Sequence, residues 1–282
     1  MKPPVPYFGA KGRTAPWITS LLPPHRHYVE PYCGGLSVLL AKRPSVMETV
    51  NDLDGDLVNF WRVLRERPED LVRACDLTPH SRAELTAAWD PTTDEVERAR
   101  RVWVRLSQGR GGMMRRTGWR HYTASSGSSI GMPGYLEAYR SRLLPAAARI
   151  ADVSLECLPA LTIIGKYGSA SASDVLLYVD PPYLSSTRRD ANSRYGVEMK
   201  TEQEHRELAA ALNDCRAAVV LSGYDSPLYS ELYKGWHRVD HQTMTGNARS
   251  GAKGRTEVLW SNRELAGSLS LFGHEGSTEA VR

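Results

Sequence analysis

Residues 175–183 form an apolar run that ends in an acid, two prolines and a tyrosine, Asp180-Pro-Pro-Tyr183. Proline has no backbone N–H and a fixed φ angle, so Pro181 and Pro182 stiffen the chain and leave carbonyl oxygens free to accept hydrogen bonds. Asp180 adds carboxylate acceptors, and Tyr183 adds an aromatic face. Acceptors beside an aromatic face suit a planar group with an exocyclic amine, so this corner predicts contact with a nucleobase.

Two further signals precede this corner in the chain. The stretch Glu30-Pro-Tyr-Cys-Gly-Gly35 carries two glycines that let the backbone approach a ligand without a Cβ in the way. Asp52 follows the next apolar run, in a position where an acid often accepts hydrogen bonds from ribose hydroxyls. Neither G-x-G-x-x-G nor G-x-x-x-x-G-K-[ST] occurs, which argues against a pyrophosphate cradle or a phosphate loop. We therefore expect a nucleoside-bearing cofactor without phosphates.

Hydrophobic periodicity places these residues at the ends of strands. Strands are predicted where short apolar runs stop at turn signals, at residues 28–29, 46–50, 153–155, 175–179, 217–221 and 257–260. Helical patterns cover residues 36–41, 57–64 and 202–212. Strands that alternate with helices favour a parallel sheet, and ligands of such sheets bind beyond the carboxyl ends of the strands. The prediction is therefore an α/β domain with the candidate residues at one edge.

The middle of the chain has a different character. Residues 68–106 are helical in pattern throughout, and residues 107–134 form a glycine- and serine-rich stretch that is longer than most connections inside compact domains. No Asp or Glu occurs in residues 98–136, whereas eight arginines do: Arg98, Arg100, Arg101, Arg105, Arg110, Arg115, Arg116 and Arg120. We therefore predict a mostly helical insertion with a basic loop that contacts a polyanion.

Within this basic block, the helix and the loop are expected to behave differently. Arg98, Arg101 and Arg105 fall at helical spacing and predict a solvated helix face. Arginines interleaved with aromatic residues are typical of nucleic-acid contact. The loop side chains predicted to contact DNA are Arg110, Arg115, Arg116, Trp119, Arg120 and Tyr122. A second basic, glycine-rich loop is predicted to grip phosphates through Asn247, Arg249 and Lys253.

Composition restricts the class of protein. The 282-residue chain is 41% hydrophobic and 24% charged with a net charge of +4, as is typical of a globular protein with a large core. No apolar run approaches the roughly 20 residues of a bilayer-spanning helix, and the N-terminus lacks the pattern of a secretory signal, so we expect a cytoplasmic protein. The four cysteines are widely spaced, and His25 and His27 lack partner cysteines nearby, so reduced thiols and no metal site are expected.

Three stretches together resemble the Dam-type DNA adenine-N6 methyltransferases, which use S-adenosylmethionine, and among them the phage-encoded members most. They are Tyr7-Phe-Gly-Ala-Lys11, Glu30-Pro-Tyr-Cys-Gly-Gly35 and Asp180-Pro-Pro-Tyr183. Their order matches the alpha arrangement of that family, with the cofactor motif first, a target recognition region next and D-P-P-Y last. Further similar stretches at residues 51–54, 198–205, 245–247 and 257–260 extend the resemblance over roughly residues 5–262.

The resemblance implies a Rossmann-like class I methyltransferase sheet with a mostly helical target recognition insertion. The expected parts are a discontinuous catalytic domain of residues 1–66 and 150–264, a target recognition region of residues 67–149 and a flexible tail of residues 265–282. Double-stranded DNA is the implied partner, and whether a separate restriction nuclease is a second partner stays open. A monomer is the expected oligomeric state.

For the site, the resemblance implies a role for each matching residue. The residues expected to contact the cofactor are Tyr7, Lys11, Glu30, Tyr32, Gly34, Gly35, Asp52 and Asp180, with the two glycines along its methionine part and Asp52 at its ribose. The expected catalytic corner is Asp180, Pro181, Pro182 and Tyr183. Asp180 and the Pro181 carbonyl would accept hydrogen bonds from N6 of a flipped-out adenine, and Tyr183 would stack on its ring.

Three alternatives stay open at this point. Cytosine-N4 methylation uses the same type of corner because the amine chemistry is the same, and only the alpha order of the motifs favours adenine. A catalytically inactive DNA-binding relative would keep the fold, although the intact Asp180, Tyr183 and Lys11 argue against it. Methylation of a protein glutamine would prefer Asn in place of Asp180. The residue that contacts the cofactor adenine also stays open, because Glu156-Cys-Leu-Pro159 stands where family members often place the acid for that contact.

Overall fold

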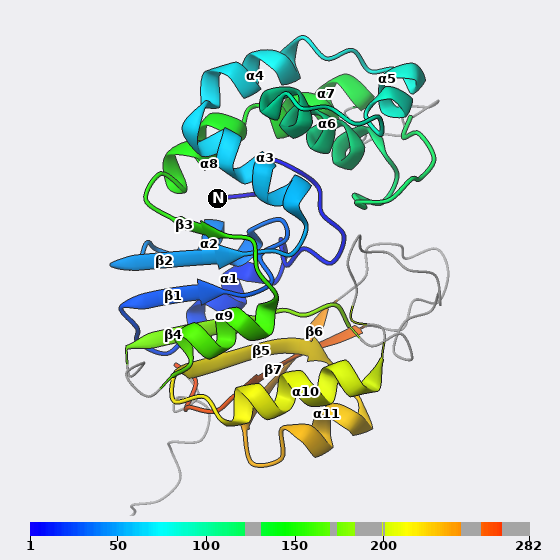
Figure 1. Ribbon diagram of the computed structural model, residues 1–282. Helices are drawn as coiled ribbons and strands as arrows, with labels where there is room; N and C mark the ends of the chain where they lie inside the picture. Colours follow the sequence, from blue (N-terminus) through cyan, green and yellow to red (C-terminus); the bar gives the residue numbers. More distant parts are fainter. Residues whose placement is uncertain (122–130, 170–173, 184–198, 200, 244–254, 267–282) are drawn as a thin grey trace, which may run out of the picture.

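The computed structural model describes residues 1–121, 131–169, 174–183, 199, 201–243 and 255–266. Its centre is a sheet of the seven strands β1 (His27–Glu30), β2 (Met47–Asn51), β3 (Ser154–Glu156), β4 (Val175–Val179), β5 (Ala218–Tyr224), β6 (His237–Thr243) and β7 (Arg255–Ser261). Their order is β3-β2-β1-β4-β5-β7-β6 (Figure 1). β1 to β5 are parallel, whereas β7 runs antiparallel to both of its neighbours. The predicted parallel sheet is confirmed, with an antiparallel pair added at one edge.

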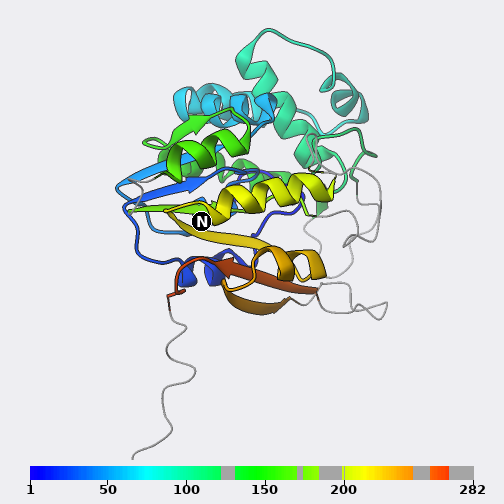
Figure 2. The same ribbon diagram turned by 60° about the horizontal axis from the view of Figure 1, so that its bottom comes forward.

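Helices cover both faces of this sheet. Those beside it are α1 (Ala15–Leu21), α2 (Ser37–Ala41), α9 (Ala160–Tyr167), α10 (Glu202–Asn213) and α11 (Pro227–Leu232). Figure 1 and Figure 2 show α9, α10 and α11 on one face, with α1 and α2 on the other. In β4, Leu177 and Val179 enter the buried cluster of α9 and α10, whereas Leu176 enters that of α1 and α2. Because successive side chains of a strand point to opposite faces, a strand buried on both faces is a continuous apolar run.

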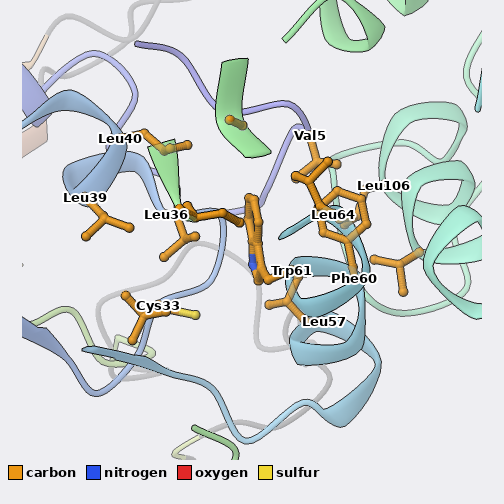
Figure 3. Close-up of a cluster of buried hydrophobic side chains, with 14 of the residues drawn as sticks. Val5, Cys33, Leu36, Leu39, Leu40, Leu57, Phe60, Trp61, Leu64 and Leu106 are labelled. Carbon is orange, nitrogen blue, oxygen red and sulfur yellow. The ribbon is translucent and has the colours of Figure 1, made fainter. Parts of the chain in front are cut away.

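The remaining helices gather beyond the β3 edge of the sheet (Figure 1). They are α3 (Gly55–Glu66), α4 (Pro68–Asp76), α5 (Arg82–Ala87), α6 (Glu95–Gln108), α7 (Gly131–Arg140) and α8 (Leu143–Arg149). α3 joins them to the sheet, because α4, α6 and α8 all pack against it. Figure 3 shows Trp61 of α3 with Leu36 and Leu40 on one side and Phe60 and Leu64 on the other. The helical region and the sheet therefore share one buried cluster.

The predicted loop of residues 107–134 is wrong at both of its ends. α6 continues to Gln108, and α7 begins at Gly131. Ser107 and Gln108 are polar but fully buried. The Ser107 hydroxyl donates to the Trp103 carbonyl at 2.6 Å, and the Gln108 side-chain amide donates to the Pro79 carbonyl at 2.9 Å. Satisfied hydrogen bonds allow such residues inside a helix, whereas their polarity alone indicates a loop. Residues 122–130 lie outside the described part of the chain.

β6 and several short helices were not predicted. The described side chains of β6 are exposed or half-buried, so this edge strand has no apolar run to reveal it. Leu265, expected in the tail, is 2% exposed within the core, and the Ala266 N–H donates to the Leu21 carbonyl at 3.1 Å. The rest of the expected tail, residues 267–282, is not described. None of the helices in the described ranges is both long and apolar enough to cross a membrane.

Candidate active site

The carboxyl ends of β1, β2 and β4 open into one cavity of about 330 Å³. Four stretches that are far apart in the sequence line it together, with the residues Lys11, Gly34, Gly35, Asp52, Asp180 and Pro182. Tyr7, Glu30 and Tyr32 also line this cavity, whereas Pro181 and Tyr183 are not part of its wall. The corner at Asp180 and the turn at Gly34 therefore face the same space, so a group held at one can react with a group held at the other.

Gly34 and Gly35 turn the chain between β1 and α2 directly against Tyr7. Gly34 has a φ of +46°, a left-handed conformation that favours glycine. A Cβ on either glycine would lie 2.9 Å from an atom of Tyr7, so neither position has room for a side chain. The Trp61 indole N–H donates to the Gly34 carbonyl at 3.0 Å. The two glycines thus permit the close packing of Tyr7 that shapes this side of the cavity.

Asp52 is fixed at the cavity wall by backbone groups. Its Oδ2 accepts the Gly34 N–H and its Oδ1 accepts the Asp54 N–H, both at 3.0 Å. Loss of hydration raises the pKa of Asp52 to about 6, against the lowering effect of these two amides. The helix cap of α3 is Asp54, which accepts from the amides of Asp56 and Leu57. Asp52 therefore serves the cavity and not the helix.

Glu30 is a buried carboxyl group in the same wall, 2% exposed. Its Oε1 accepts hydrogen bonds from the Tyr28 hydroxyl at 2.6 Å and from the Leu39 N–H at 2.9 Å. Burial raises the pKa of Glu30 to about 8, although both hydrogen bonds act to lower it. A cationic ligand would favour its ionised form. In the described part of the chain, no group of three or more His, Cys, Asp or Glu side chains is placed to hold a metal ion.

Asp180 is paired with Lys11, whose Nζ lies 2.7 Å from each carboxylate oxygen. The two side chains are 19% and 7% exposed. Burial raises the pKa of Asp180, Lys11 opposes the rise, and the charge of Glu257 adds to it. Sequence reasoning expected Lys11 at the cofactor, and the structure places it in the cavity but on the acid of the corner. Asp180 is thus an ionisable acceptor whose oxygens face a lysine.

Tyr183 packs behind the corner, 9% exposed. Its ring centre lies 4.4 Å from that of Tyr224, and the Lys11 ammonium lies 4.8 Å from its centroid. Its hydroxyl donates to Glu257 at 2.6 Å. Glu257 was not singled out from the sequence, although a glutamate in a buried strand is an unusual residue. Stacking of a base on Tyr183 stays a prediction, and it requires neighbouring side chains to uncover the ring.

Sequence reasoning also missed several residues of the cavity wall. Ser37, 8% exposed, has an Oγ with no hydrogen-bond partner within the described ranges. Leu53 and Leu161 are 48% and 42% exposed and form an apolar section of the wall with Pro159. Glu156 does not line the cavity and pairs with Lys166 at 3.2 Å. Their positions in the sequence could have revealed Ser37 and Leu53, because Ser37 comes shortly after the glycine turn and Leu53 directly follows Asp52.

The predicted solvated face is wrong for Arg101 and Arg105, whereas the side chain of Arg98 is 41% exposed. Arg105 and Arg98 bind the two carboxylate oxygens of Asp56 at 2.7 and 2.6 Å. Arg101 binds Glu97 at 2.6 Å, and the side chains of Arg101 and Arg105 are only 17% and 10% exposed. Their charges are balanced by acids that precede the acid-free block, which residue spacing within the block does not reveal. These three arginines therefore form ion pairs within the protein.

The loop arginines differ from the helical ones. Arg110 and Arg116 are exposed, and Arg115 is half-buried. Within the described ranges, no ion pair joins the arginines at positions 110, 115, 116 and 120 to an acid. Arg120 donates to the Gly109 carbonyl at 3.3 Å and lies 4.8 Å from the Tyr135 ring centre. Arg110 and Arg116 are thus the loop cations most open to an anion.

The aromatic residue Trp119 of this loop is more enclosed than Arg110 and Arg116. Trp119 stacks on both His80 and His121, with ring centres 4.5 and 5.1 Å apart, and the Arg82 guanidinium lies 4.8 Å from its ring. Contacts of Trp119 with DNA stay a prediction, since its ring already has partners. The other candidates for DNA contact, Tyr122, Asn247, Arg249 and Lys253, lie outside the described residues.

An N-terminal segment joins the basic loop to the cavity. The Phe8 N–H donates to the Gly112 carbonyl at 2.8 Å. Gly112 has a φ of +63°, and a Cβ there would lie 2.9 Å from the Pro6 carbonyl oxygen. Tyr7 and Lys11, on the same segment, line the cavity. Residues 6–11 therefore contact both the loop and the candidate site.

Known proteins resemble this chain along most of its length. The Type II methyltransferase M1.LlaDCHI of Lactococcus lactis subsp. cremoris is 26% identical over 285 residues, which cover 93% of this chain and 95% of that protein. A solved structure of a candidate rRNA-methylase from Clostridium thermocellum has a TM-score of 0.39 and 10% identity, covering 91% of this chain and 97% of that chain. The SAM-dependent methyltransferase from Agrobacterium tumefaciens has a TM-score of 0.35 and 10% identity, covering 88% and 58%.

A family model gives the broader result. The model of the D12 class of N6 adenine-specific DNA methyltransferases matches residues 7–246. This range takes in the N-terminal segment, the glycine turn, the helical region and the Asp180 corner. The chain therefore belongs to the D12 class of N6 adenine-specific DNA methyltransferases.

Proposed function

We propose that the Asp180 corner receives the exocyclic amine of one adenine within a specific site of double-stranded DNA. As a D12-class enzyme, the chain methylates adenine N6 in DNA with S-adenosylmethionine as donor, and cytosine-N4 methylation is not favoured. The observation that carries the assignment of residues is the single cavity that joins Asp180 to Gly34 and Asp52. Donor and acceptor need such a shared space because the methyl group passes directly between them.

The cavity fits S-adenosylmethionine in three respects. The buried Ser37 Oγ lacks a hydrogen-bond partner within the described residues, and the amino-acid part of the cofactor can supply one. Asp52 keeps lone pairs for ribose hydroxyls, while Leu53 and Leu161 offer apolar cover for a ring. The other residues that we propose at the cofactor are Tyr7, Lys11, Glu30, Tyr32, Gly34, Gly35 and Asp180. When bound, the cofactor supplies an electrophilic methyl group on a positively charged sulfonium.

Asp180 and the Pro181 carbonyl orient the amine in this proposal. The lone pair of adenine N6 is delocalised into the ring, and two acceptors along the N–H bonds favour its localisation on nitrogen. Fixed acceptors and alignment of the reacting atoms account for much of the acceleration in such sites. Pro182 keeps the corner rigid. Lys11, 2.7 Å from both Asp180 oxygens, must release at least one of them before the amine can bind.

The target base also has to leave the double helix. The reacting amine is hidden in a stacked base pair, so we propose that the adenine is flipped out, at a cost of a few kcal/mol. Stacking on Tyr183 would return about 1–3 kcal/mol once the ring is uncovered. The exchange is therefore nearly balanced, and contacts with the DNA backbone have to supply the remainder.

The helical region is the proposed reader of DNA. We propose residues 67–149 as the target recognition region and residues 1–66 and 150–264 as the catalytic domain. The exposed Arg110 and Arg116, which lie within residues 67–149, support the assignment of the recognition region. The Lactococcus relative is a Type II methyltransferase, which supports a separate restriction nuclease as a second partner. We further propose that the enzyme acts as a monomer in the cytoplasm, where it meets its DNA.

Sequencing of methylated bases tests the proposed function in one step. DNA from cells that express the protein should carry N6-methyladenine in one recurrent short sequence, and DNA from cells that express Asp180→Ala should carry far less. N4-methylcytosine, or N6-methyladenine without a common sequence, would contradict the proposal.

We expect the double variant Arg110→Ala with Arg116→Ala to bind DNA more weakly. Each lost phosphate contact reduces the slope of log K against log salt by about 0.9, so the double variant should lose up to about 1.8. Arg98→Ala is the matched control, because Arg98 is an arginine of the same basic block that binds Asp56 instead. Fluorescence anisotropy at several salt concentrations measures the slope. A slope equal to that of Arg98→Ala would remove both loop arginines from the DNA interface.

A further inference from the structure

Glu257 lies on β7 behind the Asp180 corner, with a side chain that is 8% exposed. Its Oε1 accepts hydrogen bonds from the Tyr183 hydroxyl at 2.6 Å and from the Ser222 hydroxyl. The same oxygen lies 3.7 Å from Lys11 Nζ. A buried carboxylate is costly unless it is paired and hydrogen-bonded. Three partners on one oxygen hold this charge at a defined place next to the site.

Lys11 is shared unequally between two carboxylates. Its Nζ is 2.7 Å from both oxygens of Asp180 and 3.7 Å from Glu257. A lysine that binds both Asp180 oxygens competes with the amine that Asp180 has to accept. Among the described residues, Glu257 is a second carboxylate near this ammonium, and a shift of about an ångström brings the pair to hydrogen-bonding distance.

We propose that Glu257 is a positioning residue for methyl transfer, because it takes over the Lys11 ammonium when the adenine amine binds Asp180. This inference rests on the proposed role of Asp180 as the acceptor of the amine. Glu257 does not line the cavity, so it acts through Lys11. Tyr183 and Ser222 keep its carboxylate in place. Its negative charge also lies near the amine, which becomes positive as it attacks the methyl group.

The charge of Glu257 also affects the titration of Asp180. Burial raises the pKa of Asp180, Lys11 lowers it and Glu257 raises it. The other described ionisable groups that act on Asp180 or share its surroundings are Glu30, Tyr178, Tyr183 and Tyr229. Without the charge on Glu257, the pKa of Asp180 falls and Lys11 stays on its oxygens. Such an enzyme is slower at neutral pH, yet its activity persists to lower pH.

Glu257→Gln tests this inference, because the amide oxygen still accepts from Tyr183 and Ser222 while the charge is lost. We expect kcat to fall about 10–100-fold and the acid limb of the kcat–pH profile to move to lower pH. The dissociation constant of the cofactor, measured by calorimetry, should change less than about tenfold, which also shows that the variant is folded. Glu264→Gln, the same substitution at an exposed position just after β7, should match the unmodified protein in all three measurements.

Two results would overturn the inference. One is a kcat within about threefold of that of the unmodified protein, and the other is a reduced kcat with the acid limb in place, which would make Glu257 merely structural. If Glu257→Gln does not fold, Glu257→Asp answers the same question. Its carboxylate is one methylene further from Lys11, so kcat must fall and the limb must again move to lower pH. An Asp180→Ala variant with an unreduced kcat would instead refute the proposed role of Asp180, whatever Glu257 does.

Discussion

Replacing Asp180 with alanine is expected to lower kcat for methyl transfer by about 10²–10³-fold, as removal of one positioned electrostatic group does in other active sites. The variant loses the carboxylate that orients the amine, while the described contacts of Gly34 and Asp52 stay intact. The dissociation constant of the cofactor should therefore change by less than about tenfold, or 1.4 kcal/mol. Transfer of tritium from labelled cofactor to DNA measures the rate, and calorimetry measures the affinity.

Two further variants make this test specific. Asp180→Asn keeps the size and one acceptor but not the charge, so its rate should lie between those of Asp180→Ala and the unmodified enzyme. Asp174→Ala removes an exposed acid directly before the same strand and should leave the rate unchanged. Because burial raises the pKa of Asp180, activity should be lost as the pH falls through this raised value. Equal rates for Asp180→Ala and Asp174→Ala would remove Asp180 from the mechanism.

Replacing Glu48 with alanine is expected to reduce the free energy of unfolding by about 3–5 kcal/mol, because it leaves buried cations without their acid. Lys42 lies 2.6 Å from Glu48 Oε1, and Arg149 donates to both of its oxygens at 2.5 and 2.9 Å. All three side chains are at most 9% exposed. Arg149 also donates to the Leu39 carbonyl at 3.0 Å, so the network joins the end of α8 to β2 and α2. Urea unfolding followed by tryptophan fluorescence measures the loss.

The control for Glu48 is an exposed ion pair. Glu66, 47% exposed, lies 2.6 Å from Arg65, and Glu66→Ala should cost no more than about 1 kcal/mol. Burial alone would raise the pKa of Glu48, but hydrogen bonds from Arg149, Lys42 and the Ser45 amide hold it below the ordinary value of 4.5. The network therefore contributes its full stability above the ordinary glutamate pKa of 4.5. That contribution is lost as the pH falls through the lower pKa that Glu48 has in the folded protein. Similar losses for Glu48→Ala and Glu66→Ala would mean that the network adds little.

Much of the candidate site could be predicted from local patterns. Asp180 and Asp52 each follow an apolar run, and the glycine turn follows another, so all three were expected at strand ends. A parallel sheet brings such ends to one edge, and the cavity that they line together agrees with that expectation. Ser81 likewise caps α5 through a local contact, because its side chain accepts a hydrogen bond from the Glu84 N–H three residues later.

Other features had no local signal. The predicted solvated face of α6 was wrong for Arg101 and Arg105 because these cations pair with Glu97 and Asp56, and helical spacing does not reveal such partners. β6 was missed because an edge strand with exposed side chains has no apolar alternation. Leu53 and Leu161 have no distinguishing pattern in the sequence. They lie together on the cavity wall only because the fold brings the end of β2 and the start of α9 to the same edge of the sheet.

The sequence by itself determined the parallel sheet, the place of the Asp180 corner and the family, because periodicity, turn residues and the order of motifs are properties of neighbouring residues. Only the tertiary structure decided which charges meet. Lys11 and Asp180 are 169 positions apart, Tyr183 and Glu257 are 74 apart, and Arg105 and Asp56 are 49 apart. The strength of such a pair depends on the distance between its atoms and on how much water surrounds them, and both of these arise only when the chain is folded.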